Sequence, residues 1–313
     1  MRRIPLFAAI WSAVLIFTNV PALAQHDLDL LYGHENGSLR VMQPEVHPVR
    51  PMVMPTQNRY LLDVGMDFFV PDGAPGFMLQ RCRVVQVYIS PGLTGTKSGI
   101  GTVFSSGNTP NYFDLPYLGT PHHHFIFSAS APGVYLFDLR AVNGHDDRGN
   151  PVMDMSTVYR IYMVAGNPPR FFGQVLPSPL YTGAVYGLWL RVRASQNGTT
   201  RSTAEQPINP WAIYAYLVAL NGSGNAHIGA KLEKHLSVRV SRNLGGAQQM
   251  NLTFPYLGDT NEDDRIDSID LQHVAQHFGG GLSSADLNGD STVNLHDLYA
   301  VLVSYARVGE DSD

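Results

Sequence analysis

Two twelve-residue segments near the C-terminus carry the side chains best suited to chemistry. Each segment places oxygen-bearing side chains at positions 1, 3, 5, 9 and 12, and the second begins 27 residues after the first. Oxygen donors at this spacing let one short loop surround a hard cation such as Ca²⁺, with a backbone carbonyl from position 7. The predicted ligands are Asp259, Asn261, Asp263, Arg265, Asp267 and Asp270 in the first segment and Asp286, Asn288, Asp290, Thr292, Asn294 and Asp297 in the second. Two bound Ca²⁺ ions are therefore predicted, with Arg265 and Thr292 contributing their carbonyls.

Apolar residues follow each segment at helical spacing. The two sets are Leu271, Val274, Ala275 and Phe278, and Leu295, Leu298, Leu302 and Tyr305. Residues three and four apart share one face of a helix, so two short helices are predicted to pack on each other through these stripes. The glycine run at 279–281 is predicted to end the first helix.

Paired loops with a helix behind each resemble a type I dockerin over residues 258–308. The resemblance implies two Ca²⁺ ions and docking to a cohesin-like protein or a cell-envelope component. It also implies a setting of polysaccharide breakdown and a choice of partner that is read at loop positions 10 and 11. Those positions hold Ser268-Ile269 in one loop and Leu295-His296 in the other, so two equivalent binding modes are not expected.

Position 6 of each loop departs from the usual pattern. The sharp turn there favours glycine, because the backbone adopts a positive φ, but the chain has Asp264 and Ser291. Both loops are predicted to bind, with the second weakened by strain of about 1 kcal/mol. Two alternatives stay open: an acidic tail without metal, and ions that only stabilise a module too small to build much core.

The N-terminus has the pattern of a secretory signal peptide. Arg2 and Arg3 precede an apolar stretch at 6–18, and Ala22-Leu23-Ala24 forms a small-residue cleavage site. Residues 1–24 are therefore predicted to be removed, which leaves a secreted, extracellular or cell-surface protein with no membrane span. An uncleaved membrane anchor is the alternative.

Charge and cysteine content restrict the class of protein further. Residues 258–313 hold 12 of the 26 acidic side chains and 2 of the 21 basic ones, a balance of −10. This acidity suits divalent cations, and the absence of a basic stripe argues against a nucleic-acid partner. Cys82 is the only cysteine, in a strand-like run, and is predicted to be a buried thiol rather than a nucleophile.

The remainder of the chain is predicted to be β structure in two units, so the fold class is mostly β: two β-sandwiches followed by a small helical dockerin-like module. Short runs rich in Val, Ile, Phe and Tyr alternate with turn residues. The predicted units are a sandwich at 25–166, a smaller sandwich at 167–257, the calcium module at 258–308 and a tail at 309–313.

Each β unit resembles a known kind of secreted domain. The opening at 26–33 and the stretch Gly119-Thr120-Pro121-His122-His123-His124 resemble choice-of-anchor M, or surface-anchored repeat, domains. The run Lys231-Leu232-Glu233-Lys234-His235-Leu236 resembles the closing strands of transthyretin-like, or carboxypeptidase-regulatory-like, sandwiches. Such modules are usually spacers or binding platforms, which implies a non-catalytic scaffold or binding role.

Two other functions are left open. Alternate residues of a strand share a face, so His122 and His124 are candidates for a second metal, Zn²⁺, against the alternative of hydrogen-bonded histidines without metal. Pairs of acids, Asp63 with Asp67 and Asp146 with Asp147, permit the hypothesis of a glycosidase that acts on polysaccharide. No catalytic serine, zinc-protease or phosphate-loop motif accompanies them, so an enzyme is the less favoured interpretation.

Overall fold

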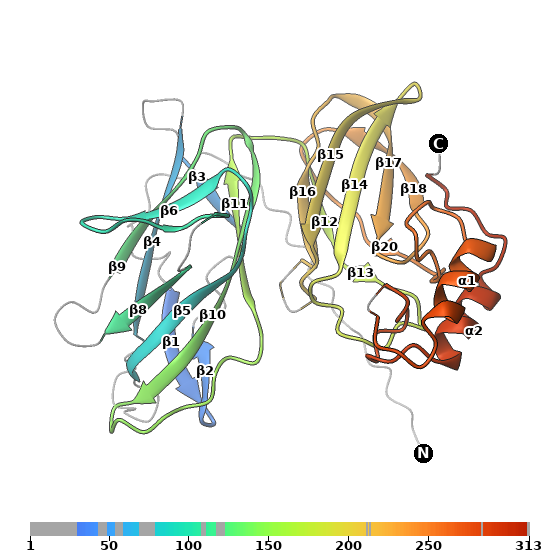
Figure 1. Cartoon of the computed structure of the whole chain (residues 1–313). Coiled ribbons are helices and arrows are strands. Elements are labelled where there is room, and N and C mark those ends of the chain that lie inside the picture. Colours follow the sequence, from blue (N-terminus) through green and yellow to red (C-terminus); the bar gives the residue numbers. More distant parts are fainter. Residues whose placement is uncertain are drawn as a thin grey trace, which may run out of the picture.

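The chain is mostly β, as the sequence predicts. Strands dominate the computed structural model, and two short helices lie near the C-terminus. Figure 1 shows two sandwiches side by side, with both helices on the side of the second sandwich that faces away from the first. No helix among the described residues is long and apolar enough to cross a membrane. The structure describes residues 30–42, 49–53, 59–68, 79–107, 111–116, 123–210, 212, 214–282 and 284–311. The predicted signal peptide lies outside them.

The first sandwich is made of two sheets. One has six strands in the order β2-β1-β4-β9-β6-β7, and the other has five in the order β3-β11-β10-β5-β8. Most neighbours are antiparallel, but β1 runs parallel to β4 and β3 runs parallel to β11. The strands are β1 (Leu30–Glu35), β2 (Ser38–Val41), β3 (Val49–Met52), β4 (Tyr60–Phe68), β5 (Leu79–Ile89), β6 (Leu93–Lys97), β7 (Gly101–Phe104), β8 (Tyr112–Pro116), β9 (His123–Ala129), β10 (Gly133–Asp146) and β11 (Tyr159–Ala165).

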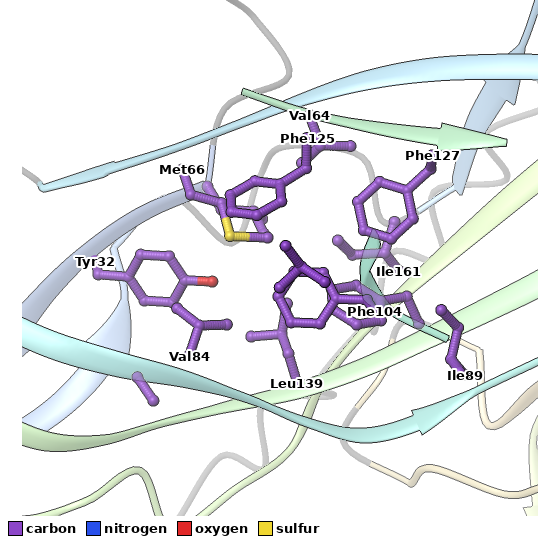
Figure 2. Packing of buried hydrophobic residues seen from close by; sticks show 14 of the residues in the cluster. Tyr32, Val64, Met66, Val84, Ile89, Phe104, Phe125, Phe127, Leu139 and Ile161 are labelled. Carbon is purple, nitrogen blue, oxygen red and sulfur yellow. The ribbon is translucent and has the colours of Figure 1, made fainter. Parts of the chain in front are cut away.

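Aromatic rings fill the space between these two sheets (Figure 2). Phe104, Phe125, Phe127 and Phe137 are fully buried and contact one another with ring centroids 4.9–6.3 Å apart. Burial of each such ring removes a large apolar area from water, and tilted ring pairs add to that stabilisation. Cys82 lies in the same core, and burial raises the pKa of its thiol, which confirms the predicted buried cysteine.

The second sandwich is smaller and more irregular. A four-stranded sheet in the order β15-β14-β17-β18 faces a three-stranded sheet, β16-β12-β19, and a two-stranded one, β13-β20. The apolar residues between them, such as Leu190, Val192 and Ile228, form one buried core. The strands are β12 (Arg170–Gly173), β13 (Val175–Leu176), β14 (Trp189–Gln196), β15 (Thr199–Pro207), β16 (Tyr216–Ala219), β17 (Gly224–Leu232), β18 (Val238–Leu244), β19 (Ala247–Gln249) and β20 (Leu252–Thr253).

A polar contact inside an apolar patch joins the two sandwiches. Arg160 of β11 makes two bonds of 2.7 Å to the carboxylate of Asp138 on β10 and a third of 2.7 Å to the carbonyl of Pro207. Both side chains of the pair are fully buried. Leu136 and Leu217 belong to a buried cluster at the same junction. The bond to Pro207 crosses to the second sandwich, and the two bonds to Asp138 hold the guanidinium in the orientation that makes it.

The C-terminal module packs on the second sandwich with a core of its own. Helices α1 (Ser268–Gln276) and α2 (Leu295–Val303) contribute Val274, Ala300 and Val301 to it. Leu236 and Leu257, which border the sandwich, are buried in the same cluster. The module and the sandwich therefore share apolar surface as well as a chain connection.

Candidate metal centre

The first loop, residues 259–270, gathers the oxygens of positions 1, 3 and 5 around one turn. The backbone N–H of Asp263 donates to Oδ1 of Asp259 and to Oδ1 of Asn261, each at 3.2 Å. Asn261 Nδ2 donates to Oδ2 of Asp263 at 2.9 Å, while Oδ1 of Asp263 accepts from the N–H of Arg265 at 3.0 Å. The side chains are thus held in place by the loop's own backbone.

The second loop, residues 286–297, repeats this arrangement. The N–H of Asp290 donates to Oδ1 of Asp286 at 3.2 Å and to Oδ1 of Asn288 at 3.0 Å. Asn288 Nδ2 donates to Oδ2 of Asp290 at 3.0 Å, and the N–H of Thr292 donates to Oδ1 of Asp290 at 2.9 Å. Equivalent bonds at positions 27 residues apart show that the two loops have the same local geometry.

Position 12 links the start of each loop to the helix that follows. Asp270 is fully buried and accepts from the N–H of Thr260 at 2.8 Å and from the N–H of Asp267 at 2.9 Å. Asp297 does the same with Leu287 and Asn294, each at 2.7 Å. Each carboxylate therefore closes its loop and turns into the loop's interior.

The position 9 residues, which are also predicted ligands, begin the two helices. Asp267 and Asn294 are the N-caps of α1 and α2, and their Oδ1 atoms accept from N–H groups of the first helical turn. The Asn294 amide also donates to the carbonyl of Thr292, the position 7 group of its loop, at 3.0 Å. These two residues start helices, which is the commonest use of Asp and Asn at such positions.

Both residues at position 6 adopt the positive φ expected there, 66° for Asp264 and 73° for Ser291. The carboxylate of Asp264 reaches out of the loop and accepts from the N–H of Ser237 at 2.7 Å and from its hydroxyl. The second sandwich therefore uses this aspartate as a contact. Ser291 keeps the strained backbone, and its side chain forms no comparable hydrogen bond with the residues that the structure describes.

Residues of the second sandwich that the sequence analysis did not identify reach both loops. Lys231 forms an ion pair with Asp259, and Lys234 donates to the carbonyl of Asp286 at 2.7 Å. The N–H groups of Thr182 and Gly183 donate to the carbonyl of Asn288, each at 2.8 Å. No local sequence pattern signals these contacts, because the residues that make them lie far from the loops along the chain.

The loop carboxylates differ in electrostatic surroundings. Burial raises the pKa of Asp259, and the nearby Lys231 ammonium opposes that effect. Burial also raises the pKa of Glu262, the position 4 residue. Hydrogen bonds from Asn288 and Asn294 lower the pKa of the exposed Asp290. Burial therefore acts on positions 1 and 4 of the first loop, whereas hydrogen bonds act on position 5 of the second.

The donor chemistry fits a hard divalent cation. Carboxylate, amide and main-chain oxygens make up both sets, with no sulfur or imidazole, which is the ligand type that Ca²⁺ prefers. Within the described part of the chain, no three His, Cys, Asp or Glu side chains cluster closely enough to form a metal site by themselves.

The residues considered for a zinc site or for glycosidase chemistry form contacts of other kinds. His124 lies 2.9 Å from Asp63 through Nδ1 and Oδ1, across β9 and β4. His122 lies outside the described residues. Oδ1 of Asp67 accepts from the N–H of Phe68, and Asp146 accepts from the N–H groups of Arg148 and Asn150 in a turn. The zinc site remains a prediction without support from these contacts.

The apolar stripes predicted for the two helices are partly wrong. Val274 is buried and Leu271 is half-buried, but Ala275 and Phe278 are exposed. On α2 the buried residues are Ala300 and Val301, whereas Leu295 and Leu302 are 70% and 57% exposed. The outer side of α2 is therefore apolar, and none of the described segments covers it.

Comparisons with known proteins agree with this geometry at the C-terminus. The model of the "Dockerin type I domain" matches residues 257–302. No curated protein matches the chain.

Several solved structures share limited likeness with the chain. A mutant type II Cohesin-X-Dockerin complex from Acetivibrio cellulolyticus matches with 17% identity over 45% of this chain and 98% of that chain, at a TM-score of 0.35. A second mutant of that complex matches with 16% identity over the same shares, at a TM-score of 0.35. The TIE protein of Bacillus anthracis matches with 5% identity over 67% of this chain and 39% of that chain, at a TM-score of 0.20. At these scores the likenesses are not evidence for a shared fold. The family match identifies residues 257–302 of this chain as a type I dockerin domain.

Proposed function

We propose that this chain is a secreted, non-catalytic modular protein whose Ca²⁺-loaded dockerin docks it to a cohesin-like partner in a polysaccharide-degrading assembly. The dockerin match and the oxygen-rich geometry of both loops support this proposal. The division into units at 25–166, 167–257 and 258–308 is part of the proposal, and three separate apolar cores support it. The likeness of the first two units to anchor-type and transthyretin-like domains stays a prediction.

The exposed face of α2 is the observation that carries the docking proposal. Leu295, Tyr299, Leu302 and Val303 lie on one side of this helix and are each more than half exposed. Residues at such spacing form one continuous surface on a helix. An apolar surface of this kind, exposed in a chain whose three units each have a buried core, is typical of a protein–protein contact.

The equivalent face of α1 does not offer the same surface. The residues 27 positions earlier are Ser268, Gln272, Ala275 and Gln276. Only Ile269, which corresponds to His296, is a large exposed apolar side chain on α1. The two helices are therefore not interchangeable, and α2 is proposed as the docking helix.

Calcium, when bound, would neutralise the carboxylates of each loop and hold the turn closed. The chain's own contribution is to orient the helices, because Asp270 and Asp297 are both loop ligands and part of the first helical turn. Asp267 and Asn294 cap those turns. Loss of the ion is therefore expected to loosen the start of α2 and with it the docking face.

The test is binding of the full chain to a panel of purified type I and type II cohesin modules, measured by calorimetry in Ca²⁺ and in chelator. At least one module is expected to bind in Ca²⁺ only. Leu302→Asp on α2 should weaken this binding more than a hundredfold, because it places a charge in an apolar contact. The matched control is Ala275→Asp at the equivalent position of α1, with an expected change below threefold.

Two results would contradict the proposal. One is the absence of binding to every cohesin of the panel by a chain that is folded and loaded with Ca²⁺. The other is an equal loss of affinity in the two aspartate variants, which would remove the distinction between α2 and α1.

A further inference from the structure

Lys231, close to the end of β17, contacts the first calcium loop although it belongs to the sandwich. Its ammonium donates to Oδ2 of Asp259 and to the carbonyl of His235. The same nitrogen lies 3.4 Å from Oδ1 of Asp264 and 3.9 Å from Oε2 of Glu262. The Lys231 side chain is 12% exposed and that of Asp259 is fully buried. One fixed cation thus faces three carboxylates of a single loop.

The ammonium is positioned behind the predicted ligand oxygen of Asp259 and not in its place. Oδ2, which Lys231 contacts, also accepts from the N–H of Asp264 at 2.8 Å. Oδ1 of Asp259 accepts from the N–H of Asp263, which also donates to Oδ1 of Asn261. Oδ1 therefore faces the other predicted ligands. The lysine and a bound cation can accordingly be present together, on opposite sides of one carboxylate.

The second loop has a different cationic neighbour. Oδ2 of Asp286 accepts from the N–H of Ser291 at 2.8 Å, the equivalent of the bond in the first loop. Lys234, three residues after Lys231, binds the main-chain carbonyl of Asp286. The two loops share their backbone geometry, so the ammonium on the position 1 carboxylate is a difference specific to the first loop.

We propose that Lys231 is a tethered counter-ion of the first loop: it keeps this loop folded on the sandwich without metal and lowers the loop's affinity for Ca²⁺. The inference rests on the proposed Ca²⁺ binding of the module. An ionised carboxylate as buried as Asp259 is costly unless a cation lies next to it, and Lys231 supplies that cation before Ca²⁺ arrives. Once Ca²⁺ binds, two positive charges flank one carboxylate, and their repulsion weakens binding. The sandwich thereby sets the calcium range over which the first loop fills.

Calcium titration of the full chain by calorimetry tests the first part. The Asp290→Ala background disables the second loop at an exposed position, so the first loop is measured alone. In that background Lys231→Met and Lys231→Gln should each tighten Ca²⁺ binding about tenfold, because each removes the repelling charge. The glutamine variant keeps a hydrogen-bond donor and so separates charge from packing. Arg191→Met is the control, since Arg191 pairs across the strands with Lys231 but forms its ion pair with Glu205; a change below twofold is expected.

Thermal unfolding tests the second part without any partner. In chelator, Lys231→Met should unfold several degrees below the unaltered chain, because Asp259 is left buried without its cation. In saturating Ca²⁺ the difference should shrink. Unchanged or weaker Ca²⁺ affinity, or an equal loss of stability in both conditions, overturns the inference while leaving calcium binding in place. Absence of Ca²⁺ binding by the unaltered chain overturns the proposed function and this inference together.

Discussion

Asp264 shows how one residue serves two structural requirements at once. Its φ of 66° satisfies the turn at position 6, and its carboxylate accepts two hydrogen bonds from Ser237 of the sandwich. A Cβ at Gly309 would lie only 2.1 Å from Oδ2 of Asp264, so the C-terminal segment also packs closely on this side chain. The aspartate that departs from the usual glycine is therefore explained by a contact outside the loop.

A glycine at position 6 should improve Ca²⁺ binding in the second loop but should lower the stability of the chain in the first. Ser291→Gly relieves a left-handed backbone and removes no contact, so Ca²⁺ binding at the second loop should tighten about threefold. Asp264→Gly relieves the same strain but leaves the Ser237 N–H without its acceptor, so the free energy of unfolding should fall by about 1–2 kcal/mol. Calorimetric titration and urea unfolding measure the two effects. Weaker binding by Ser291→Gly would contradict the strain argument.

His235 predicts a pH dependence of stability. Burial lowers the pKa of this histidine to about 4 from an ordinary 6.5. Its Nε2 accepts from the N–H of Ser178 at 3.1 Å, which favours the neutral ring. Between those two pH values the unfolded chain binds the proton and the folded chain does not, so the free energy of unfolding falls as pH decreases through this range. The full loss is about 3 kcal/mol, complete near pH 4.

Urea unfolding at pH 7, 6, 5 and 4 measures this loss. His235→Gln removes the titrating group, so the same decrease of pH should cost that variant about 3 kcal/mol less. His227→Gln, at an exposed histidine of the same sandwich, is the control and should behave as the unaltered chain does. Equal slopes for all three proteins would show that His235 titrates normally.

Loop residues and their neighbours differ in how far the sequence predicts them. The ligand positions follow from spacing within twelve residues, and the structure gathers the oxygens of positions 1, 3 and 5 in both loops. Lys231 precedes Asp259 by 28 residues and reaches it only because of how the sandwich packs on the loop. No local pattern encodes such a contact.

At the level of elements, the buried aspartates at position 12 of each loop set the rotation of the two helices. Asp270 and Asp297 must point into their loops, and both are fully buried. Residues four positions later, Val274 and Val301, lie on the same face and form the core. Apolar periodicity alone placed Leu302 in that core, because it did not include the aspartate that fixes the inward face.

Alanine substitutions on neighbouring residues of α2 should separate core from surface. Val301→Ala removes buried methyl groups and should lower the free energy of unfolding by about 1–3 kcal/mol. Leu302→Ala, at a residue that is 57% exposed, should change it by less than about 0.5 kcal/mol. Urea unfolding in saturating Ca²⁺ measures both. The reverse order would place α2 in the rotation that the sequence stripe predicted.

Strand β15 shows why some strands cannot be predicted from apolar patterns. Its sequence, from Thr199 to Pro207, is polar and mostly exposed, so no apolar alternation marks it. The turn before it does carry a signal, because Asn197 and Gly198 both have positive φ, as a two-residue hairpin turn requires. Reading that dipeptide as a turn would have predicted the hairpin with β14.

At the level of the whole molecule, the sandwich and the dockerin are joined at several places along one side. Asp311, near the C-terminus, pairs with Arg193 and lies 3.6 Å from Arg239. Gly229 provides the space for the Asp311 carboxylate, since a Cβ at this position would lie 1.6 Å from Oδ2 of Asp311. Because both loops contact the sandwich and the apolar side of α2 is exposed, the proposed docking through α2 would leave this junction intact.

The buried Asp138–Arg160 pair, which lies at the junction with the second sandwich, should contribute strongly to stability. Asp138→Ala leaves the Arg160 guanidinium buried without its carboxylate partner, so the free energy of unfolding should fall by about 3–5 kcal/mol. Asp114→Ala breaks the exposed pair with Arg83 and should cost less than about 1 kcal/mol. Equal losses in the two variants, measured by urea unfolding, would show that burial does not distinguish the pairs.

The most direct test of the account is a calorimetric Ca²⁺ titration of the full chain after treatment with chelator. Two bound ions per chain are predicted. Asp263→Ala and Asp290→Ala, at the exposed position 5 residues of the two loops, should each leave one ion bound, and the double variant none. A chain that is folded but binds no Ca²⁺, or that keeps two ions in either single variant, would contradict the account.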